Sequence, residues 1–350
     1  MAPDSKANTA VARQSRRGPL RIWSEYLALR GSAMALSTMP ASWVRDAARL
    51  AGWLMYRLDR KHRRRALFNI HLALPHLPAP EAERVALRSM QHCCQTFLGM
   101  AALARSAGEE PLRRITGVTP DAPPPPAAVT APGPSIFVTG HVGNWELLGL
   151  GLRHMGVPLH AVARIVDNPR IDRWTVERRN YFGIRMVARD DLAAMHRVMR
   201  AAGALGFIAD QNAGDRGAFV PFFGRLASAH RGPGALAIYY DAPVICGYAR
   251  HLGPGLECKM ECTDVIRPKD YRRHPDPIYY VAARIQRAIE NIVRRWPQQY
   301  LWIHRRWKSR PPHEVRRQPM PDRLRNSLLS LPWMTEELMA ELEKPVGLLP

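Results

Sequence analysis

Short apolar runs alternate with longer segments of helical periodicity through the second half of the chain. Apolar runs bounded by Gly, Pro or polar residues are typical of buried strands, whereas apolar residues three and four apart indicate helices. On this pattern we predict strands at 136–138, 159–163, 184–187, 205–209, 244–249 and 300–303, and helices from 147 onward and at 168–182, 191–202, 230–240 and 277–296. The alternation predicts an α/β fold with a mixed, largely parallel sheet flanked by helices.

The first hundred residues have helical periodicity only. We predict amphipathic helices at 44–56, 66–74 and 80–104, and six cations crowd into 57–65. The stretch 20–43 is apolar but contains Glu25 and Arg30, so it is too polar for a confident transmembrane helix. It suits either an interfacial helix lying at headgroup level or a core helix of the domain, and the pattern favours neither.

The punctuation of the chain predicts its organisation. Residues 1–18 read as a disordered basic arm, and 19–118 as a helical, membrane-associating region. A linker at 119–134 contains a run of four prolines, Pro123–Pro126, which must be extended. We expect the α/β core at 135–311 and a C-terminal tail at 312–350.

Charge narrows the class of partner. The chain of 350 residues has 51 Lys and Arg against 30 Asp and Glu, a formal net charge of +21. Such a chain needs an anionic partner: nucleic acid, an anionic membrane face or a phosphorylated substrate. The 5 cysteines are odd in number and have no His partners at zinc spacing, so we expect a reducing compartment and no metal. We find no convincing signal peptide.

Candidate chemistry begins where the strand at 136–138 ends. His141 follows that strand, and Glu146 lies one turn into the next helix, which puts both groups at the ligand-binding edge of an open sheet. A neutral imidazole can take the proton of an alcohol, and a carboxylate on its far nitrogen would fix the tautomer. We therefore predict His141 as a base and Glu146 as its orienting carboxylate. The alternative is a capping His and a surface Glu.

Further polar groups follow other predicted strands, and each has a plainer interpretation. Arg164 could clamp a phosphate or a carbonyl oxygen, or simply pair with Asp167. Asp210 and Gln211 suggest a binding loop or an Asx-turn. The apolar run 219–223 is either core or the wall of an acyl groove. Arg231 starts a predicted helix, where backbone N–H groups can bind phosphate.

A basic cluster closes the core. His304, Arg305, Arg306 and Lys308 lie beside Trp302 and Trp307. Aromatic and cationic residues together fit single-stranded nucleic acid, or a phosphoglycolipid headgroup or the acidic surface of acyl carrier protein. We can name no nucleic-acid motif in this strand-helix order.

Three blocks resemble one known family. HVGNWELLG, from His141, is similar to the H-x4-D/E block of the bacterial lipid A biosynthesis acyltransferases, and DQNAGDRGAFVPFFGRLASAHRGPGALA and WIHRRWKSRP resemble two more of its blocks. The resemblance covers roughly 20–311. It implies a glycerolipid-acyltransferase-like core, an N-terminal hydrophobic anchor, and O-acyl transfer without a cofactor or metal.

The resemblance also implies partners and site residues. The donor would be acyl carrier protein and the acceptor a hydroxyl of a lipid A precursor, at the cytoplasmic face of the inner membrane, with no nucleic acid involved. Another glycolipid acceptor, such as a phosphatidylinositol mannoside, and a non-catalytic nucleic-acid-binding protein remain as alternatives. The expected catalytic residues are His141 and Glu146, and the expected substrate-binding residues are Arg164, Asn144, Asp210, Gln211, Arg231 and Arg305.

Overall fold

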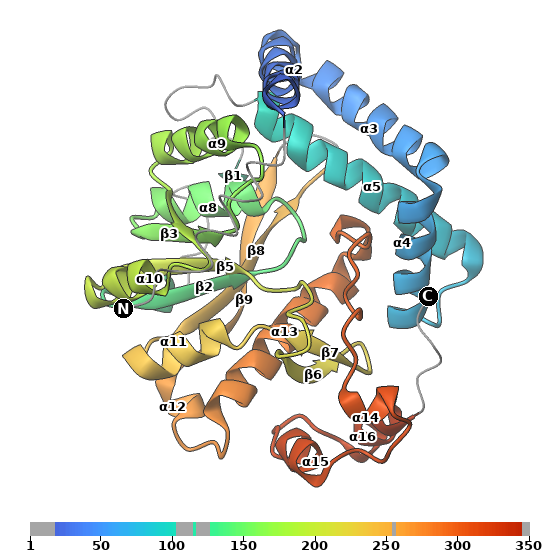
Figure 1. The fold of residues 1–350 in the computed structure, drawn as a ribbon, viewed down its shortest axis with the longest axis vertical. Helices are drawn as coiled ribbons and strands as arrows, with labels where there is room; N and C mark the ends of the chain where they lie inside the picture. The colour runs from blue at the N-terminus through green and yellow to red at the C-terminus, as the bar shows by residue number, and fades with distance from the viewer. Residues whose placement is uncertain (1–17, 103–114, 117–126, 254–256, 345–350) are drawn as a thin grey trace.

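A seven-stranded sheet forms the centre of the computed structural model, which describes residues 18–102, 115–116, 127–253 and 257–344 (Figure 1). The strand order is β1-β9-β8-β2-β5-β3-β4. All neighbouring strands run parallel except β8 and β9. The strands are β1 (Ile115–Thr116), β2 (Ser135–Thr139), β3 (Leu159–Ala163), β4 (Arg185–Ala188), β5 (Ala204–Ile208), β8 (Val244–His251) and β9 (Cys258–Ile266).

Strand β2 lies in the middle of the sheet, and all five of its residues are buried. Because side chains alternate along a strand, Phe137 faces one layer of helices, and Ile136 and Val138 face the other. A central strand buried on both faces needs a continuous apolar run, which is what the sequence has here.

Helices cover both faces of the sheet. On the side of Phe137 lie α8 (Trp145–His154) and α9 (Pro169–Tyr181). On the opposite side lie α10 (Leu192–Arg200), α11 (Gly232–Tyr240) and the long α13 (Pro277–Arg295) (Figure 1). Short elements complete the core: α7 (Ala127–Thr130), α12 (Pro268–Tyr271) and the 3-10 helix η2 (Pro297–Gln299).

Four helices from the N-terminal part run along one side of this core (Figure 1). They are α2 (Pro19–Thr38), α3 (Ala41–Leu58), α4 (Arg60–Ala73) and α5 (Ala79–Ala102). Helices α4 and α5 contribute Ile70 and Met90 to the main hydrophobic core. Their polar residues Asn69 and Ser89 donate to the carbonyls of Trp302 and Tyr300, at 2.6 and 2.5 Å. The N-terminal helices therefore help to fix the segment that follows η2.

Helix α2 is not a core helix, because Ala33 is its only buried residue. Within the described parts of the chain, no helix combines the length and the hydrophobicity needed to cross a bilayer. The predicted membrane association of this region stays a prediction. The basic arm falls almost entirely on residues outside the described part of the chain, as does the 119–126 part of the linker.

Most predicted strands and helices of the core are present, with two differences. The predicted strand at 300–303 is wrong: Tyr300 makes one isolated bridge to Val142, and the chain then turns. The antiparallel hairpin β6 (Ala218–Phe222) and β7 (Arg225–Ala229) and the strand β9, which lies between β1 and β8, were not predicted. The tail contains α14 (Pro312–Val315), α15 (Asp322–Leu329) and α16 (Glu336–Glu343). Leu328 of α15 and Leu342 of α16 join the main core.

Candidate active site

A tight loop after β2 holds His141 in place. The backbone N–H of Gly143 donates to the carbonyl of Gln299 at 3.1 Å, and the N–H of Leu301 donates to the carbonyl of His141 at 3.0 Å. Gly143 has φ +64°, and a Cβ there would lie 2.1 Å from the carbonyl oxygen of Ala249. Only glycine fits this close approach, so a larger residue at 143 would displace the loop.

His141 is bonded twice to Asp210. Strands β2 and β5 are adjacent and in register, with Thr139 opposite Ile208, so the residues after the two strands meet at one edge. His141 Nδ1 lies 2.7 Å from Asp210 Oδ1, and the His141 backbone N–H donates to Oδ2 at 2.8 Å. The Asp210 side chain is 0% exposed, whereas the His141 side chain is 17% exposed. The pair is a buried carboxylate that supports an accessible imidazole.

The carboxyl of Asp210 stays ionised in this buried position. Burial alone would raise its pKa, but the charge of His141 and two hydrogen bonds from that residue outweigh burial and lower the pKa well below its usual range. An ionised Asp210 accepts the proton on Nδ1 of His141. The Nε2 atom of His141 is then the nitrogen that can act as a base.

Buried polar residues hold the backbone next to Asp210. Gln286 donates to the carbonyl of Ala209 at 2.9 Å, and Arg306 donates to Gln286 Oε1 at 2.9 Å. Arg306 is only 2% exposed and also donates to the carbonyl of Ser228 at 2.7 Å. The buried guanidinium therefore fixes the chain just before Asp210.

Glu146 does not occupy the position predicted for it. Its carboxylate forms a two-pronged ion pair with Arg179 of α9, whose Nε lies 3.1 Å from Glu146 Oε2. The residue that accepts from His141 Nδ1 is Asp210. The first turn of α8 directs Glu146 toward α9, whereas sheet pairing brings Asp210 directly beside His141.

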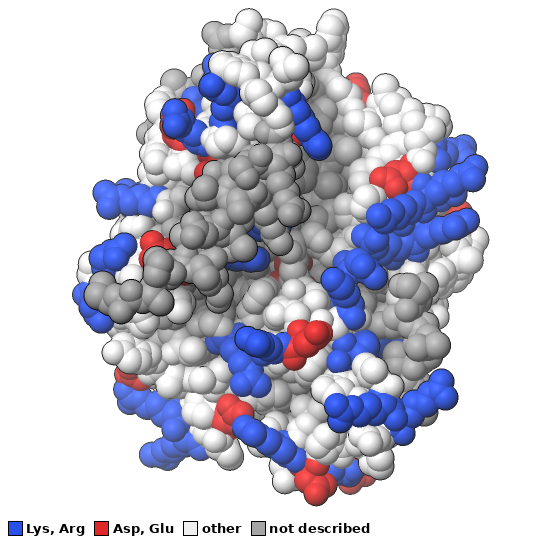
Figure 2. All heavy atoms as spheres, in the orientation of Figure 1, with Lys and Arg blue, Asp and Glu red and all other residues white. Residues whose placement is uncertain are grey.

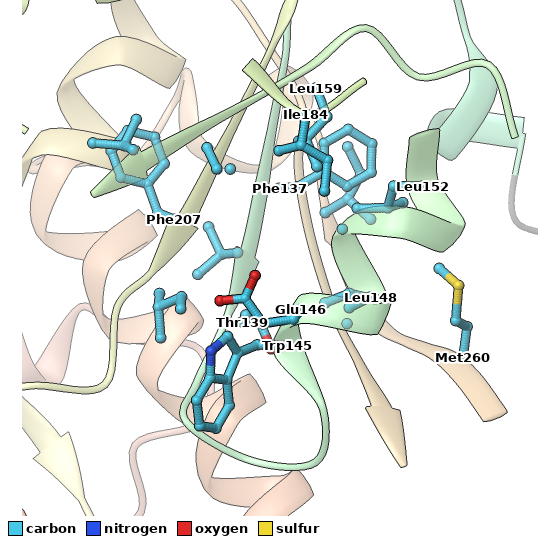
Figure 3. A pocket seen from close by; sticks show the side chains of 18 of the residues that line it. Phe137, Thr139, Trp145, Glu146, Leu148, Leu152, Leu159, Ile184, Phe207 and Met260 are labelled. Atoms are coloured by element: carbon cyan, nitrogen blue, oxygen red, sulfur yellow. The ribbon is translucent and has the colours of Figure 1, made fainter. Parts of the chain in front are cut away.

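An apolar cavity of about 430 Å³ lies between the sheet and α8. Thr139, Trp145 and Glu146 lie at one end, and Phe137, Leu152, Leu159 and Ile184 lie toward the other (Figure 3). The ring of Trp145 packs against that of His141, with 5.1 Å between centroids. The polar end of the cavity is therefore next to the base.

The structure brings together some of the predicted binding residues and separates others. Gln211 lies beside His141, with 3.4 Å between Gln211 Nε2 and His141 Nε2. Asn144 is fully buried and caps α8 by accepting from the N–H of Leu147 at 3.1 Å. Asp210 is likewise fully buried, and its carboxylate contacts His141. Substrate binding by Asn144 and Asp210 stays a prediction.

The predicted cationic residues are on the surface. Arg164 donates to Asp167 at 2.7 Å, as in its plainer interpretation, and its side chain is 53% exposed. Arg231 and Arg305 are exposed as well. Arg231 is the residue before α11.

Two residues of the site lacked a clear signal in the sequence. Arg179 lies in a polar helix with no distinctive motif, and only the three-dimensional structure pairs it with Glu146. His304 packs against His141 with 4.8 Å between ring centroids, but in the sequence it is one of several residues in a basic cluster. The sequence places Asp210 after a predicted strand, but only the structure shows that this strand lies beside β2.

The chain is similar in sequence to several known proteins of one family. A region of the chain is 29% identical over 168 residues to the lipid A biosynthesis lauroyltransferase of Escherichia coli (strain K12), and covers 47% of this chain and 54% of that protein. The lipid A biosynthesis palmitoleoyltransferase of the same strain is 28% identical over 178 residues, with 47% and 53% covered. The chain thus spans about half the length of these two relatives.

A longer match extends this similarity. The lipid A biosynthesis acyltransferase of Haemophilus influenzae is 24% identical over 259 residues, which cover 73% of this chain and 78% of that protein. The family model described as bacterial lipid A biosynthesis acyltransferase matches residues 12–309. With a match over most of its length, the chain belongs to the bacterial lipid A biosynthesis acyltransferase family.

Proposed function

We propose that this protein is a membrane-associated O-acyltransferase. It transfers a fatty acyl chain from an acyl thioester, with acyl carrier protein as the expected donor, to a hydroxyl of a lipid A precursor. The observation that carries the proposal is the His141–Asp210 pair beside the polar end of an apolar cavity. The similarity to named lipid A transferases supports the choice of acceptor.

The reaction uses His141 as a general base. Its Nε2 takes the proton of the acceptor hydroxyl, and the oxygen attacks the thioester carbonyl carbon. The new C–O bond forms as the C–S bond breaks, and the leaving thiolate takes the proton back from His141. Asp210 stabilises the imidazolium in between. Helix α8 begins at Trp145, so its dipole favours the negative charge that develops nearby.

The apolar cavity would bind the acyl chain of the donor. A volume of 430 Å³ is in the range of small-molecule pockets, and its far wall is aliphatic and aromatic. Each methylene buried there would contribute about 0.8 kcal/mol. The Glu146–Arg179 pair lies at the polar end, where it would hold the thioester end of the donor away from the apolar wall.

The exposed arginines suit an anionic acceptor. Arg231 and Arg305 are free to reach a phosphate, and Arg164 could exchange its exposed contact with Asp167 for one. Exposed ion pairs contribute little stability, so such an exchange costs little.

The N-terminal helices form a surface that binds the cytoplasmic face of the inner membrane. Large apolar side chains on α2 and α3 are exposed, among them Leu27, Trp43 and Leu58. Lys and Arg side chains gather beside them, over α3 and α4 (Figure 2). Apolar insertion together with attraction to anionic lipid gives stable peripheral attachment, whereas one signal alone is marginal.

The test is mass spectrometry of lipid A from a strain that lacks this protein. We expect the loss of one acyl chain, and its return when the wild-type gene, but not a His141→Ala gene, is supplied. Unchanged lipid A in the deletion strain, or full restoration by His141→Ala, would contradict the proposal.

A further inference from the structure

The amide of Gln211 lies between two imidazoles. Gln211 Nε2 is 3.0 Å from His304 Nε2 and 3.4 Å from His141 Nε2. The two rings pack edge to face, with an interplanar angle of 65°. An amide nitrogen has two hydrogens to donate and accepts none. It can therefore bond to both rings only when both Nε2 atoms are unprotonated.

Each ring has a reason to be in that state. The Nδ1–H of His141 donates a hydrogen bond to the ionised Asp210, which leaves Nε2 as an acceptor. Burial lowers the pKa of His304 to about 4; the charge of Asp210 opposes this shift, and the charge of Arg65 adds to it. The backbone of His304 is fixed as well, because Asn69 donates to its carbonyl at 2.7 Å. His304 is thus a neutral acceptor in a fixed position.

We infer that Gln211 and His304 are positioning residues that keep Nε2 of His141 unprotonated and aimed at the place where the acceptor hydroxyl binds. His304 holds the amide so that its N–H group, and not its carbonyl oxygen, faces His141. The hydroxyl displaces this N–H when it binds. The identity of the hydroxyl rests on the proposed function, but the effect on the ring does not.

Loss of either positioning residue has a predictable electrostatic effect. An N–H donated to Nε2 stabilises the neutral imidazole, so its removal favours the protonated form. Without His304 as acceptor, the Gln211 amide can also rotate and offer its oxygen to the protonated ring. In both variants we expect His141 to take up a proton at a higher pH than in wild type.

Other groups around the ring stay constant in this comparison. Several titratable or charged residues act on His141, either directly or through Asp210 and His304. They lie at the end of β5, just before α11, just after η2, and on helix α4. On α8, Glu146 is already paired with Arg179. The constant set comprises Asp210, His230, Tyr300, Arg306 and Arg65, and His304 is changed only in its own variants.

The experiment follows the ring of His141 by NMR in the full-length protein. Its resonance is identified by its loss in His141→Gln, and its titration midpoint is compared between variants. We expect the midpoint to rise by about one pH unit in Gln211→Leu and in His304→Phe. His304→Gln keeps an acceptor, and His71→Gln changes an exposed histidine of α4, so both should match wild type. The acid limb of kcat/KM should move in parallel.

An unchanged midpoint in both Gln211→Leu and His304→Phe overturns the inference, even if turnover falls. Gln211→Leu decides alone if His304→Phe does not fold, because Gln211 lies on a half-exposed loop. The titration requires no transfer activity. Failure of the proposed function, seen as no transfer by wild type at any pH, is therefore distinguished from failure of this inference.

Discussion

At the scale of single residues, the orientation of His141 depends on one buried carboxylate. Asp210→Asn keeps the shape but replaces an acceptor with an amide that can donate to Nδ1, which stabilises the wrong tautomer. We expect kcat to fall by about 10²–10⁴-fold, the usual contribution of an acid-base group. Steady-state transfer assays measure this.

Asp215 provides a matched control for that substitution. It lies in the same loop but is exposed. Asp215→Asn should retain wild-type turnover. Equal, small losses in both variants would mean that Asp210 does not orient the base.

The low pKa of His304 gives the protein an acid-sensitive stability. The folded state holds this ring neutral down to a pKa of about 4, whereas in the unfolded chain the ring has its ordinary pKa of 6.5. The contribution of His304 is therefore complete above about pH 6.5 and is lost as the pH falls from 6.5 toward 4.

His304→Gln removes this titration. Between pH 7 and pH 5, wild type should lose about 2 kcal/mol more of its unfolding free energy than the variant does. Denaturant titrations at the two pH values measure the difference. Parallel losses in the two proteins would show that His304 is not held neutral in the folded state.

At the scale of secondary-structure elements, the packing of α8 on the sheet controls the cavity. A Cβ on Gly149 would lie 3.1 Å from Ile184 Cδ1 and 3.7 Å from Leu159 Cδ2, and all three residues line the cavity. Gly149→Ala should stabilise α8 by up to about 1 kcal/mol through helix propensity. It should also narrow the cavity.

We therefore expect Gly149→Ala to lower kcat/KM for long acyl donors several-fold and to spare short ones. Competition between donors of different chain length measures the preference. Gly31→Ala on α2, where the added Cβ meets nothing within 4 Å, is the control for helix propensity alone. An unchanged chain-length preference would mean that the acyl chain does not occupy this cavity.

The alternating core elements were predictable from the sequence because they are defined locally. The apolar run at 136–138 and the cap and proline at Asn168 and Pro169 specify a strand and a helix start without reference to the rest of the chain. The apolar run 219–223 in the hairpin β6–β7 has no strand alternation, so the sequence indicates only core or the wall of a groove there. The apolar 300–303 run makes one bridge, from Tyr300 to Val142, and then turns.

The partners in the candidate site were less predictable, because they come from distant segments. Glu146 is five residues from His141 in sequence, yet Asp210, 69 residues away, accepts the hydrogen bonds of His141. Sequence proximity favoured the wrong carboxylate, and only the adjacency of β2 and β5 identifies the other. His304 is brought close by contacts from α4 and α5, which no local pattern encodes.

At the scale of the whole molecule, the exposed apolar helices and the cation run should act as separate contributions to membrane binding. The electrostatic contribution is screened by salt, and the apolar one is not. Replacing Arg57, Arg60, Lys61 and Arg64 by Glu should abolish the salt-sensitive part of binding to anionic vesicles. Replacing Leu20, Leu27 and Met34 by Ser should remove the salt-resistant part.

Vesicle sedimentation across a salt series measures both parts. Val315→Ser with Leu329→Ser, on exposed residues of the C-terminal segment, is the matched control and should bind like wild type. Binding that is equal in all variants would place the membrane contact elsewhere. Wild-type protein that ignores anionic vesicles at low salt would contradict peripheral attachment.

The most direct test of the central claim is acyl transfer by purified protein, with acyl carrier protein as the thioester donor and a lipid A precursor as acceptor. Mass spectrometry should detect an acceptor heavier by one acyl chain with wild type and with His71→Ala, an exposed-histidine control on α4. His141→Ala should lose at least about 100-fold in rate while its thermal unfolding remains cooperative. Transfer by His141→Ala at the wild-type rate, or no transfer by wild type, would contradict the account.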